Sequence, residues 1–330
     1  ANQLAMMMTS TNAEVRKLAS GFAARLPIDS STYVSKFLNS AKKQALDSQT
    51  PLNQRVSAIE MLSIAPYETL APIAITLLDP KQPPSLQLAA IIALGKSHDI
   101  RVARELIKAW PSLTPKSRTV VLETLLSQEN RLPVLLEAME NRAIQIGDLS
   151  AIQREKLIQS DHAHRTKKLL AAFSSDADLP KRIARYQKAL TVNRDGANGK
   201  SIYAKNCLMC HKLDNEGNEI GPSLASISGK PDEGILMDIL DPNGKIDPEY
   251  KLYLVTTSTG GSHAGVLANE SATSLTLKRP DGKTDIILRK DIKTMTTSEV
   301  SLMPANLHEQ ITPAEMASLV TFLRTKFGKR

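Results

Sequence analysis

Hydrophobic residues recur at helical spacing through the first half of the chain, in segments separated by short polar or proline-containing turns. Three nine-residue segments can be aligned on one another, and each is followed by a second apolar segment of helical period. Apolar positions spaced in this way predict amphipathic helices. The aligned segments begin at Gln54, Leu86 and Ser117, 32 and then 31 residues apart, and the second segments cover residues 70–78, 102–110 and 132–139.

Proline lies near the start of each of these three units. Pro51, Pro83 and Pro115 precede or begin the first helix, where the fixed φ and missing N–H of proline are tolerated. A lone helix pair cannot bury its apolar face, so pairs repeated at this interval stack on their neighbours. The period therefore predicts a short α-helical solenoid over residues 1–195, which resembles repeats of the HEAT type.

The pattern changes beyond about residue 196. Short helices are predicted at residues 201–206 and 233–240, and β-rich runs separated by turn formers follow over about residues 250–296. A capping box at residues 312–315 begins a final amphipathic helix. The predicted fold is mainly α: a helical repeat domain, then a domain at 196–330 with a small antiparallel β insertion. The β runs cover residues 251–257, 263–267, 274–278 and 284–288, and one more closes at Met295.

The segment between the two predicted domains is rich in turn formers. It runs over residues 193–199, Asn-Arg-Asp-Gly-Ala-Asn-Gly, and we interpret it as the linker. A length of 330 residues allows two domains that each bury a core. An apolar content of 42% and a charged content of 23% are those of ordinary globular proteins.

Several classes of protein do not fit the sequence. No run of eighteen apolar residues occurs, so no membrane span is expected. Residues 1–10 lack a basic stretch followed by an apolar core, so we expect a mature chain, a fragment of an exported polypeptide, or a cytoplasmic protein. Basic residues are scattered among acidic ones rather than interleaved with aromatics, which argues against binding to nucleic acid.

The net charge of +8 admits two interpretations. One is a solvated, moderately cationic surface. The other is that lysines close to the cysteine motif described next steer an acidic redox partner toward it. These lysines are Lys205, Lys212, Lys230, Lys245 and Lys251.

The chain has two cysteines, Cys207 and Cys210, and His211 follows the second. A disulfide framework needs more cysteines and wider loops. Two thiols one helical turn apart can each add to a vinyl group of haem, and the adjacent histidine then lies under the iron as its proximal ligand. This is the CxxCH spacing of c-type haem attachment, and it predicts one covalent haem c.

Three other interpretations of the cysteine pair remain open. A structural zinc site needs four ligands, and no second Cys or His pair stands at finger spacing. A thioredoxin-like pair needs a βαβ context, whereas the residues before Cys207 have a helical pattern. A reduced, inert pair leaves His211 without a role.

The residues around the motif resemble a cytochrome c domain. Gly199 and Tyr203 stand eight and four residues before Cys207, where cytochromes c place a glycine and an aromatic at a helix crossing. Gly221-Pro-Ser-Leu224 resembles the loop in which a proline carbonyl accepts the N–H of the proximal imidazole. The resemblance implies that Tyr203, Pro222 and Leu224 help to form the haem site, and that Pro222 orients His211.

The second axial ligand must come from later in the chain. Met303 is favoured because Ser301-Leu-Met-Pro304 precedes the final helix, where cytochromes c carry the axial methionine. His308 is the rival. Met237 and Met316 lie in apolar helical patterns typical of core residues, Met295 is expected to pack, and His263 is expected on an exposed hairpin. The candidates are thus Met237, His263, Met295, Met303, His308 and Met316.

The region from Gly199 to Lys326 is most similar to one family, the haem-binding domain of the Pirellula/Verrucomicrobium type. The β insertion is the distinctive part of this resemblance. It lies ahead of residues 301–304, which we call the methionine loop. Members often follow HEAT-like repeats, C-terminal to a propeller dehydrogenase domain for sugars or alcohols. The resemblance implies an exported, periplasmic or otherwise extracytoplasmic electron carrier, with His211 and Met303 as iron ligands and a dehydrogenase as the electron donor.

Two other functions remain open. The repeats could recruit a partner protein while the haem domain acts as a sensor or structural element. An open iron could also act as a peroxidase, although the few distal His and Arg candidates argue against that. In the favoured interpretation the chain is not an enzyme by itself but an electron-transfer module with a redox partner protein.

Overall fold

The computed structural model describes residues 7, 14–15, 18–19, 32–172, 178–191, 196–244, 246–298 and 300–327. The chain divides into two compact units: Ala1–Ala138 with Ser271–Thr273, and Met139–Glu270 with Ser274–Arg330. The domain boundary expected near residue 195 stays a prediction, and the expected linker lies partly outside the described residues. Within the described part of the chain, no helix combines the length and the apolar character needed to cross a membrane.

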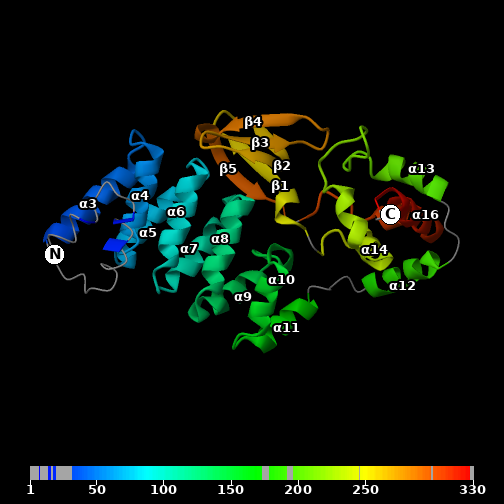
Figure 1. Cartoon of the computed structure of the whole chain (residues 1–330), viewed down its shortest axis with the longest axis horizontal. Coiled ribbons are helices and arrows are strands. Elements are labelled where there is room, and N and C mark those ends of the chain that lie inside the picture. Colours follow the sequence, from blue (N-terminus) through cyan, green and yellow to red (C-terminus); the bar gives the residue numbers. More distant parts are fainter. Residues whose placement is uncertain are drawn as a thin grey trace. The chain divides into compact units, whose positions relative to one another are not determined.

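The first unit is built from helices that follow one another along the chain (Figure 1). A helix covers each of the six segments predicted from the hydrophobic period, while the HEAT-type solenoid stays a prediction. The helices are α3 (Thr32–Leu46), α4 (Leu52–Leu62), α5 (Tyr67–Leu77), α6 (Pro84–Gly95), α7 (Arg101–Ala109), α8 (Pro115–Leu126) and α9 (Leu132–Glu140), with short 3₁₀ turns η1 (Trp110–Ser112) and η2 (Glu129–Arg131).

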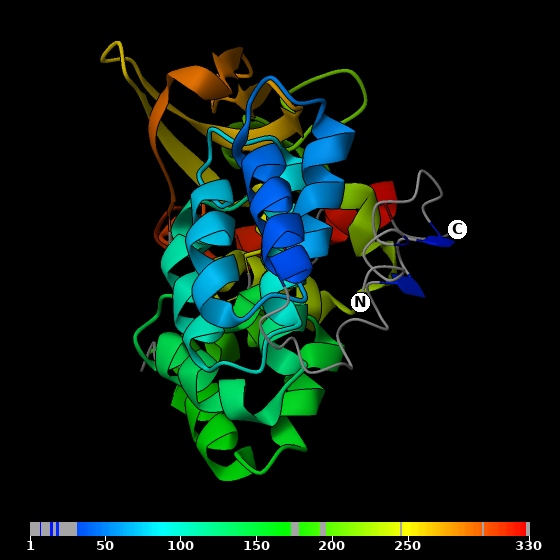
Figure 2. The ribbon, with the colours of Figure 1, turned by 90° about the vertical axis from the view of Figure 1, so that its left-hand side faces the viewer.

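The first helices of the three repeated units are α4, α6 and α8, and they pack on one another. Helix α4 packs against α6, and α6 packs against α8. Helix α3, which precedes the units, packs against α4. Figure 2 shows the helices α3 to α6 lying side by side. Their contact faces are aliphatic, and Ala90 in the middle of α6 is fully buried. Small and branched side chains at these positions bring the helices close enough to share one core.

A buried polar side chain occupies the same place in each of the three units. Arg55, Gln87 and Arg118 stand 32 and 31 residues apart, at the second position of each aligned segment. Each donates to a backbone carbonyl near the C-terminal end of the preceding helix, where carbonyls lack partners within the helix. The bonds are Arg55 Nε to Ala45 O at 3.0 Å, Gln87 Nε2 to Asp79 O at 2.9 Å and Arg118 Nε to Trp110 O at 3.2 Å.

The second unit contains one antiparallel sheet, in the strand order β4-β3-β2-β1-β5. The predicted sheet is confirmed, and the run closing at Met295 forms its fifth strand. One face buries an aliphatic cluster in which Met295 is 3% exposed, as its packing role predicted. The strands are β1 (Leu252–Thr257), β2 (Ser262–Glu270), β3 (Ser274–Lys278), β4 (Thr284–Leu288) and β5 (Ile292–Thr297), with η6 (Arg289–Asp291) before the last.

Lys251 immediately precedes the first strand and is fully buried. Its ammonium lies 2.7 Å from Oδ1 of Asp148, and both side chains are 1% exposed. The other carboxylate oxygen of Asp148 accepts the backbone N–H of Gln145 at 2.8 Å. The hypothesis that Lys251 faces a partner is therefore wrong, because a buried ammonium needs a counter-charge inside the protein and Asp148 supplies it.

Helices also surround the predicted haem motif in the second unit. Helix α13 packs against α16, and α12 packs against both α16 and α14. The capping box predicted at Thr312 is present, since Glu315 Oε2 accepts the Thr312 N–H at 2.8 Å. The helices are α10 (Ala151–Ile158), α11 (Ala163–Ala172), α12 (Leu179–Leu190), α13 (Gly196–Asn206), α14 (Asp232–Leu240), α15 (Leu307–Gln310) and α16 (Pro313–Phe327), with η3 (Ile146–Asp148), η4 (Leu224–Gly229) and η5 (Pro248–Tyr250).

Candidate functional site

The two cysteines lie on a single turn that continues α13. The N–H of Cys207 donates to Tyr203 O at 2.8 Å, and the N–H groups of Cys210 and His211 both donate to Cys207 O, at 3.0 and 2.9 Å. Both thiols are free and half-buried. This turn places two sulfur atoms and one imidazole close together, as the CxxCH spacing predicts.

The imidazole of His211 is held by the loop that follows it. Its Nδ1 lies 2.9 Å from the carbonyl oxygen of Pro222. A carbonyl only accepts, so Nδ1 carries the proton and Nε2 keeps its lone pair. Burial lowers the pKa of His211, while the hydrogen bond to Pro222 acts in the opposite direction. The ring is therefore neutral at neutral pH, in the tautomer that binds a metal through Nε2.

Gly221 lets the loop backbone pass directly against this imidazole. A Cβ at this position would lie 2.5 Å from Cε1 of His211, closer than real Cβ atoms come to carbon. The Gly221 N–H donates to Cys210 O at 2.8 Å, and the Ile220 N–H donates to the same oxygen at 3.0 Å. The loop from Ile220 to Pro222 thus holds both the CxxCH turn and the ring of its histidine.

Tyr203 supports the histidine from the side of α13. Its hydroxyl donates to the backbone carbonyl of His211 at 2.7 Å, and its ring lies 5.6 Å from that of Phe322 on α16. Burial raises the pKa of Tyr203 to about 12, so the hydroxyl stays a donor. Gly199 lies where α13 meets α16, and a Cβ there would collide with the carbonyl oxygen of Ser318.

Asn218 is a further residue of this site that the sequence analysis missed. Its side-chain amide donates to Met209 O at 3.0 Å, and its backbone N–H donates to Leu208 O at 3.3 Å. It therefore binds the two residues between the cysteines to the loop. The turn-forming run Asp-Asn-Glu-Gly-Asn at 214–218, with Gly217 at φ +83°, marks a tight loop in the sequence but not the partners of Asn218.

Leu224 and Met303 are both half-buried against the same apolar cluster as Cys207. Met303 lies in a loop that bends at Leu302 and Met303 and is held by Ser301. The hydroxyl of Ser301 accepts the Met303 N–H at 3.1 Å, and the Ser301 N–H donates to Oδ1 of Asn243 at 2.8 Å. The assignment of Met303 as the distal ligand stays a prediction, as do the roles of Tyr203, Pro222 and Leu224 toward the haem.

The other methionine candidates lie elsewhere. Met316 is fully buried in the core of the second unit, as predicted. Met237 is 40% exposed, so the expectation that it is a core residue is wrong. The buried stripe of α14 falls at Ile235, Leu236, Ile239 and Leu240, and this spacing turns position 237 outward.

The two histidine candidates are engaged by other groups. Nδ1 of His263 lies 3.0 Å from Oδ2 of Asp285 on β4, and the ring is only partly exposed. The expectation of an exposed hairpin position is therefore corrected, because the carboxylate holds the ring against the sheet. Nδ1 of His308 lies 3.1 Å from Ala305 O.

The lysines proposed to steer a partner are largely paired with acids. Besides the buried Lys251, two of them meet carboxylates on the surface, and Lys205 is exposed, whereas Lys245 lies outside the described residues. Lys278 of β3 also approaches Glu219 at 3.8 Å. The two surface pairs are Lys212 with Glu219 at 3.1 Å, and Lys230 with Asp238.

The donor set fits a covalently attached haem. Burial raises the pKa of Cys207 to about 12, with the charge of Cys210 acting in the same direction, and burial also raises the pKa of Cys210. Both sulfurs are therefore thiols, and the turn that joins Cys207 to His211 brings them together with the imidazole, as covalent attachment of haem requires. No group of three or more His, Cys, Asp or Glu side chains able to hold a bare metal ion occurs among the described residues.

Comparison with known proteins agrees with this geometry. Residues 196–326 match the family model described as Cytochrome c. The chain is 34% identical over 97 residues to a "Cytochrome c homolog" of Rickettsia bellii, covering 28% of the chain and 53% of that protein. It is 50% identical over 46 residues to a "Cytochrome c homolog" of Rickettsia conorii, covering 14% of the chain and 25% of that protein. The chain thus spans about half the length of the first relative (53%) and a quarter of the second (25%).

The segment at 196–326 contains the CxxCH turn, the loop at Pro222, the sheet, the methionine loop and all but the last residue of α16. The family implies a covalently bound haem c with its iron, and the two cysteines that this attachment requires are present. Residues 196–326 thus match the cytochrome c family, and the function associated with that family is haem-based electron transfer.

Proposed function

We propose that this protein is a monohaem electron carrier, in which Cys207 and Cys210 form thioethers and His211 and Met303 bind the iron. The observation that carries the proposal is the bond between His211 Nδ1 and Pro222 O at 2.9 Å. An imidazole fixed in this way presents Nε2 in a defined direction, which a metal ligand requires. A thiol-redox interpretation gives this bond no role, and a zinc site would need further ligands, which the described residues do not group together.

Each residue of the site has a defined task. Bound haem c supplies a single-electron couple between ferrous and ferric iron. The Pro222 carbonyl keeps the proton of the imidazole on Nδ1, and the Tyr203 hydroxyl and Gly221 hold the backbone and ring of His211 in place. The apolar cluster that includes Leu224 keeps water from the site. A thioether from Met303 favours ferrous iron, which corresponds to a comparatively high reduction potential.

The partners follow from the same proposal. An outer-sphere carrier needs one donor and one acceptor protein. On the resemblance to the Pirellula/Verrucomicrobium type, we propose a sugar or alcohol dehydrogenase, in the same polypeptide or a separate one, as the donor. Covalent haem attachment needs an oxidising compartment with maturation machinery, so the proposed location is periplasmic or otherwise extracytoplasmic.

For the first unit we propose a HEAT-like scaffold that brings the haem domain to its partner. The proposal is supported by the contact that Arg55, Gln87 and Arg118 make at matching positions, and by the packing of α4 on α6 and of α6 on α8. Repeat arrays of this kind offer extended surfaces for binding other proteins.

The test begins with protein expressed in an exporting host that matures c-type haem. The intact mass should exceed the sequence mass by one haem, and acid–organic extraction should leave the colour on the protein. Voltammetry should show one reversible wave that carbon monoxide does not change. His211→Ala should abolish that wave, whereas His162→Ala, in the turn before α11, should preserve it.

Other outcomes would point elsewhere. Haem that can be extracted, or bound zinc in its place, contradicts covalent attachment. Rapid carbon monoxide binding by the reduced wild type would show an open iron, and the carrier would give way to a sensor or a peroxidase.

A further inference from the structure

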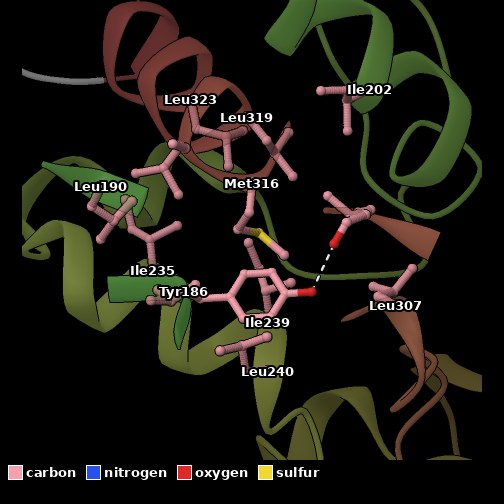
Figure 3. Packing of buried hydrophobic residues seen from close by; sticks show 14 of the residues in the cluster. Tyr186, Leu190, Ile202, Ile235, Ile239, Leu240, Leu307, Met316, Leu319 and Leu323 are labelled. Atoms are coloured by element: carbon pink, nitrogen blue, oxygen red, sulfur yellow. Dashed lines mark hydrogen bonds between the residues drawn. The ribbon is translucent and has the colours of Figure 1, made fainter. Parts of the chain in front are cut away.

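Helix α12 is built into the core around the haem motif, although it precedes the segment similar to cytochrome c. The family match begins at residue 196, whereas α12 covers Leu179–Leu190. Leu179, Tyr186 and Leu190 are at most 7% exposed and belong to the same apolar cluster as the buried residues of α14 and α16. Figure 3 shows Tyr186 and Leu190 among Ile235, Ile239 and Met316 in this cluster.

The hydroxyl of Tyr186 reaches the segment that follows the methionine loop. It lies 2.6 Å from His308 O and 2.8 Å from Ile311 O, and both oxygens are backbone carbonyls that can only accept. These partners are 122 and 125 residues away in sequence. The ring is 2% exposed, so water does not compete for these carbonyls.

The two carbonyls belong to α15 (Leu307–Gln310) and the residue after it. This helix has one turn, closed by the bond from Ile311 N–H to Leu307 O at 3.0 Å. A single turn is marginal by itself, because it satisfies few of its own backbone groups. Leu307 and Ile311 are buried in the same cluster, and the bond from Tyr186 adds a directional contact between α12 and the backbone of this segment.

The methionine loop is thus held at both ends. At its beginning, Ser301 is bound to Asn243, which follows α14. At its end, four residues after Met303, the chain enters α15, which Tyr186 binds to α12. Between these anchors Met303 is half-buried against the core.

We propose that Tyr186 is a positioning residue for the distal side of the haem: by fixing α15, it fixes the loop that presents Met303 to the iron. The inference rests on the proposed role of Met303. It places the start of the electron-transfer unit at α12, ahead of residue 196. Tyr186 then does for the distal segment what Tyr203 does for His211, each through one neutral hydroxyl bound to backbone.

The consequence for the iron is a closed distal site. A loop fixed at both ends keeps the methionine sulfur in place in both oxidation states, and a foreign ligand must first displace it. If one anchor is lost, the loop opens more often, and the apparent affinity for a foreign ligand rises with the fraction of open molecules.

Tyr186→Phe in the full-length holoprotein tests this inference. The substitution keeps the ring and its packing and removes only the donor. We expect imidazole to bind the ferric form about tenfold more tightly, because a buried hydrogen bond is lost. We also expect amide hydrogen exchange over residues 305–312 to become faster by about the same factor, and this measurement does not depend on redox activity.

Two matched variants separate positioning from general destabilisation. Tyr67→Phe changes a tyrosine of the first unit and should leave both measurements as in the wild type. Leu190→Ala weakens the packing of α12 without touching the hydroxyl. It should lower the melting temperature at least as much as Tyr186→Phe, but change imidazole binding less.

The outcomes distinguish this inference from the proposed function. If Met303→Ala opens the iron to imidazole while Tyr186→Phe changes neither measurement, the carrier stands and the role of Tyr186 is wrong. That role is also wrong if Leu190→Ala matches Tyr186→Phe in imidazole binding, because the effect is then one of packing. If Met303→Ala leaves imidazole binding unchanged, the axial assignment falls, and the positioning role falls with it.

Discussion

The two units satisfy the carbonyl groups near their helix ends by different means. In the first unit, Arg55, Gln87 and Arg118 reach back 8 to 10 residues to the preceding helix. In the second, Tyr203 reaches 8 residues forward, and Tyr186 reaches more than 120 residues to the far side of the fold. The contacts of the first unit are local and repeated, whereas those of the second unit include the contact of Tyr186, which exists only after the whole unit has folded.

The chemistry of the donors differs as well. In the first unit two of the three donors are guanidinium groups, which carry a full charge, and the third is the neutral amide of Gln87. At the two segments that present the proposed iron ligands, the donors are neutral hydroxyls. A fixed charge beside a redox centre shifts its potential, whereas a hydroxyl orients the backbone with a much smaller electrostatic effect. Neutral donors at these two segments fit the proposed role of the second unit in holding iron ligands.

The largest expected effect comes from a charge placed in the helical core. Ala90 is fully buried on α6, which packs against both α4 and α8. Ala90→Asp should destabilise the first unit by several kcal/mol, because an unpaired buried carboxylate costs that much. A typical domain is stable by only about 5–15 kcal/mol, so most of the helical signal of this unit should be lost at room temperature.

Circular dichroism on heating measures this change. The matched control is Ile92→Asp, because Ile92 is on the same helix and is 50% exposed. It should shift stability by no more than about 0.5 kcal/mol. Equal melting of the two variants would show that the three units do not share one core.

The next effect concerns the repeated polar contact. Arg118→Met keeps much of the side-chain volume but removes the hydrogen bonds to Trp110 O and Pro111 O and the contact of the guanidinium with the Trp110 ring, at a cost of about 1–3 kcal/mol. Arg118→Gln introduces the residue found at the matching position 87, so its loss of stability should be smaller. Urea unfolding of both variants, with the exposed Arg104→Met as control, measures the difference. If Gln is no better than Met, the three positions are not equivalent.

An effect of similar size is expected where the loop backbone passes the imidazole. In Gly221→Ala the new Cβ would lie 2.5 Å from His211 Cε1, so the ring must move. Overpacking of this kind costs about 1–3 kcal/mol, and the moved ligand should also change the reduction potential. Gly229→Ala is the control, since nothing lies within 4 Å of its added Cβ. An unchanged potential in Gly221→Ala would mean that the loop does not fix the histidine.

The smallest effect should come from the hydroxyl on the proximal side. Tyr203→Phe removes one hydrogen bond to His211 O, worth about 0.5–1.5 kcal/mol. Because Tyr203 and Tyr186 serve different segments, the double variant should lose the sum of the two single losses to within about 0.5 kcal/mol. Thermal unfolding of the wild type, the two single variants and the double variant measures these losses. A clear departure from additivity would show that the two sides are coupled.

The sequence predicted those features that depend on near neighbours. The helices of the first unit follow from a period that every pair repeats, and the CxxCH turn follows from five consecutive residues. The bond from His211 Nδ1 to Pro222 O joins residues 11 apart, and a resemblance of motifs was enough to expect it.

Other features depend on partners that the sequence does not pair. Lysine is typical of surface positions, so the sequence alone places Lys251 on the surface. Its burial depends on the pairing with Asp148. Asn218 and Tyr186 have no local pattern that reveals their acceptors, and those of Tyr186 come from a different part of the fold. Met237 was misjudged because a nine-residue helix with an apolar stripe still turns some apolar residues outward.

The buried ion pair of Lys251 and Asp148 also restricts which substitutions the protein can tolerate. The two positions lie about a hundred residues apart, one before the first strand and the other in a short 3₁₀ turn, yet neither charge is tolerable without the other. A recombination that transferred only residues 196–326 would carry the ammonium and leave its carboxylate behind. Related proteins should therefore keep both charges or replace both, and the pair marks a stretch of sequence that is inherited as one piece.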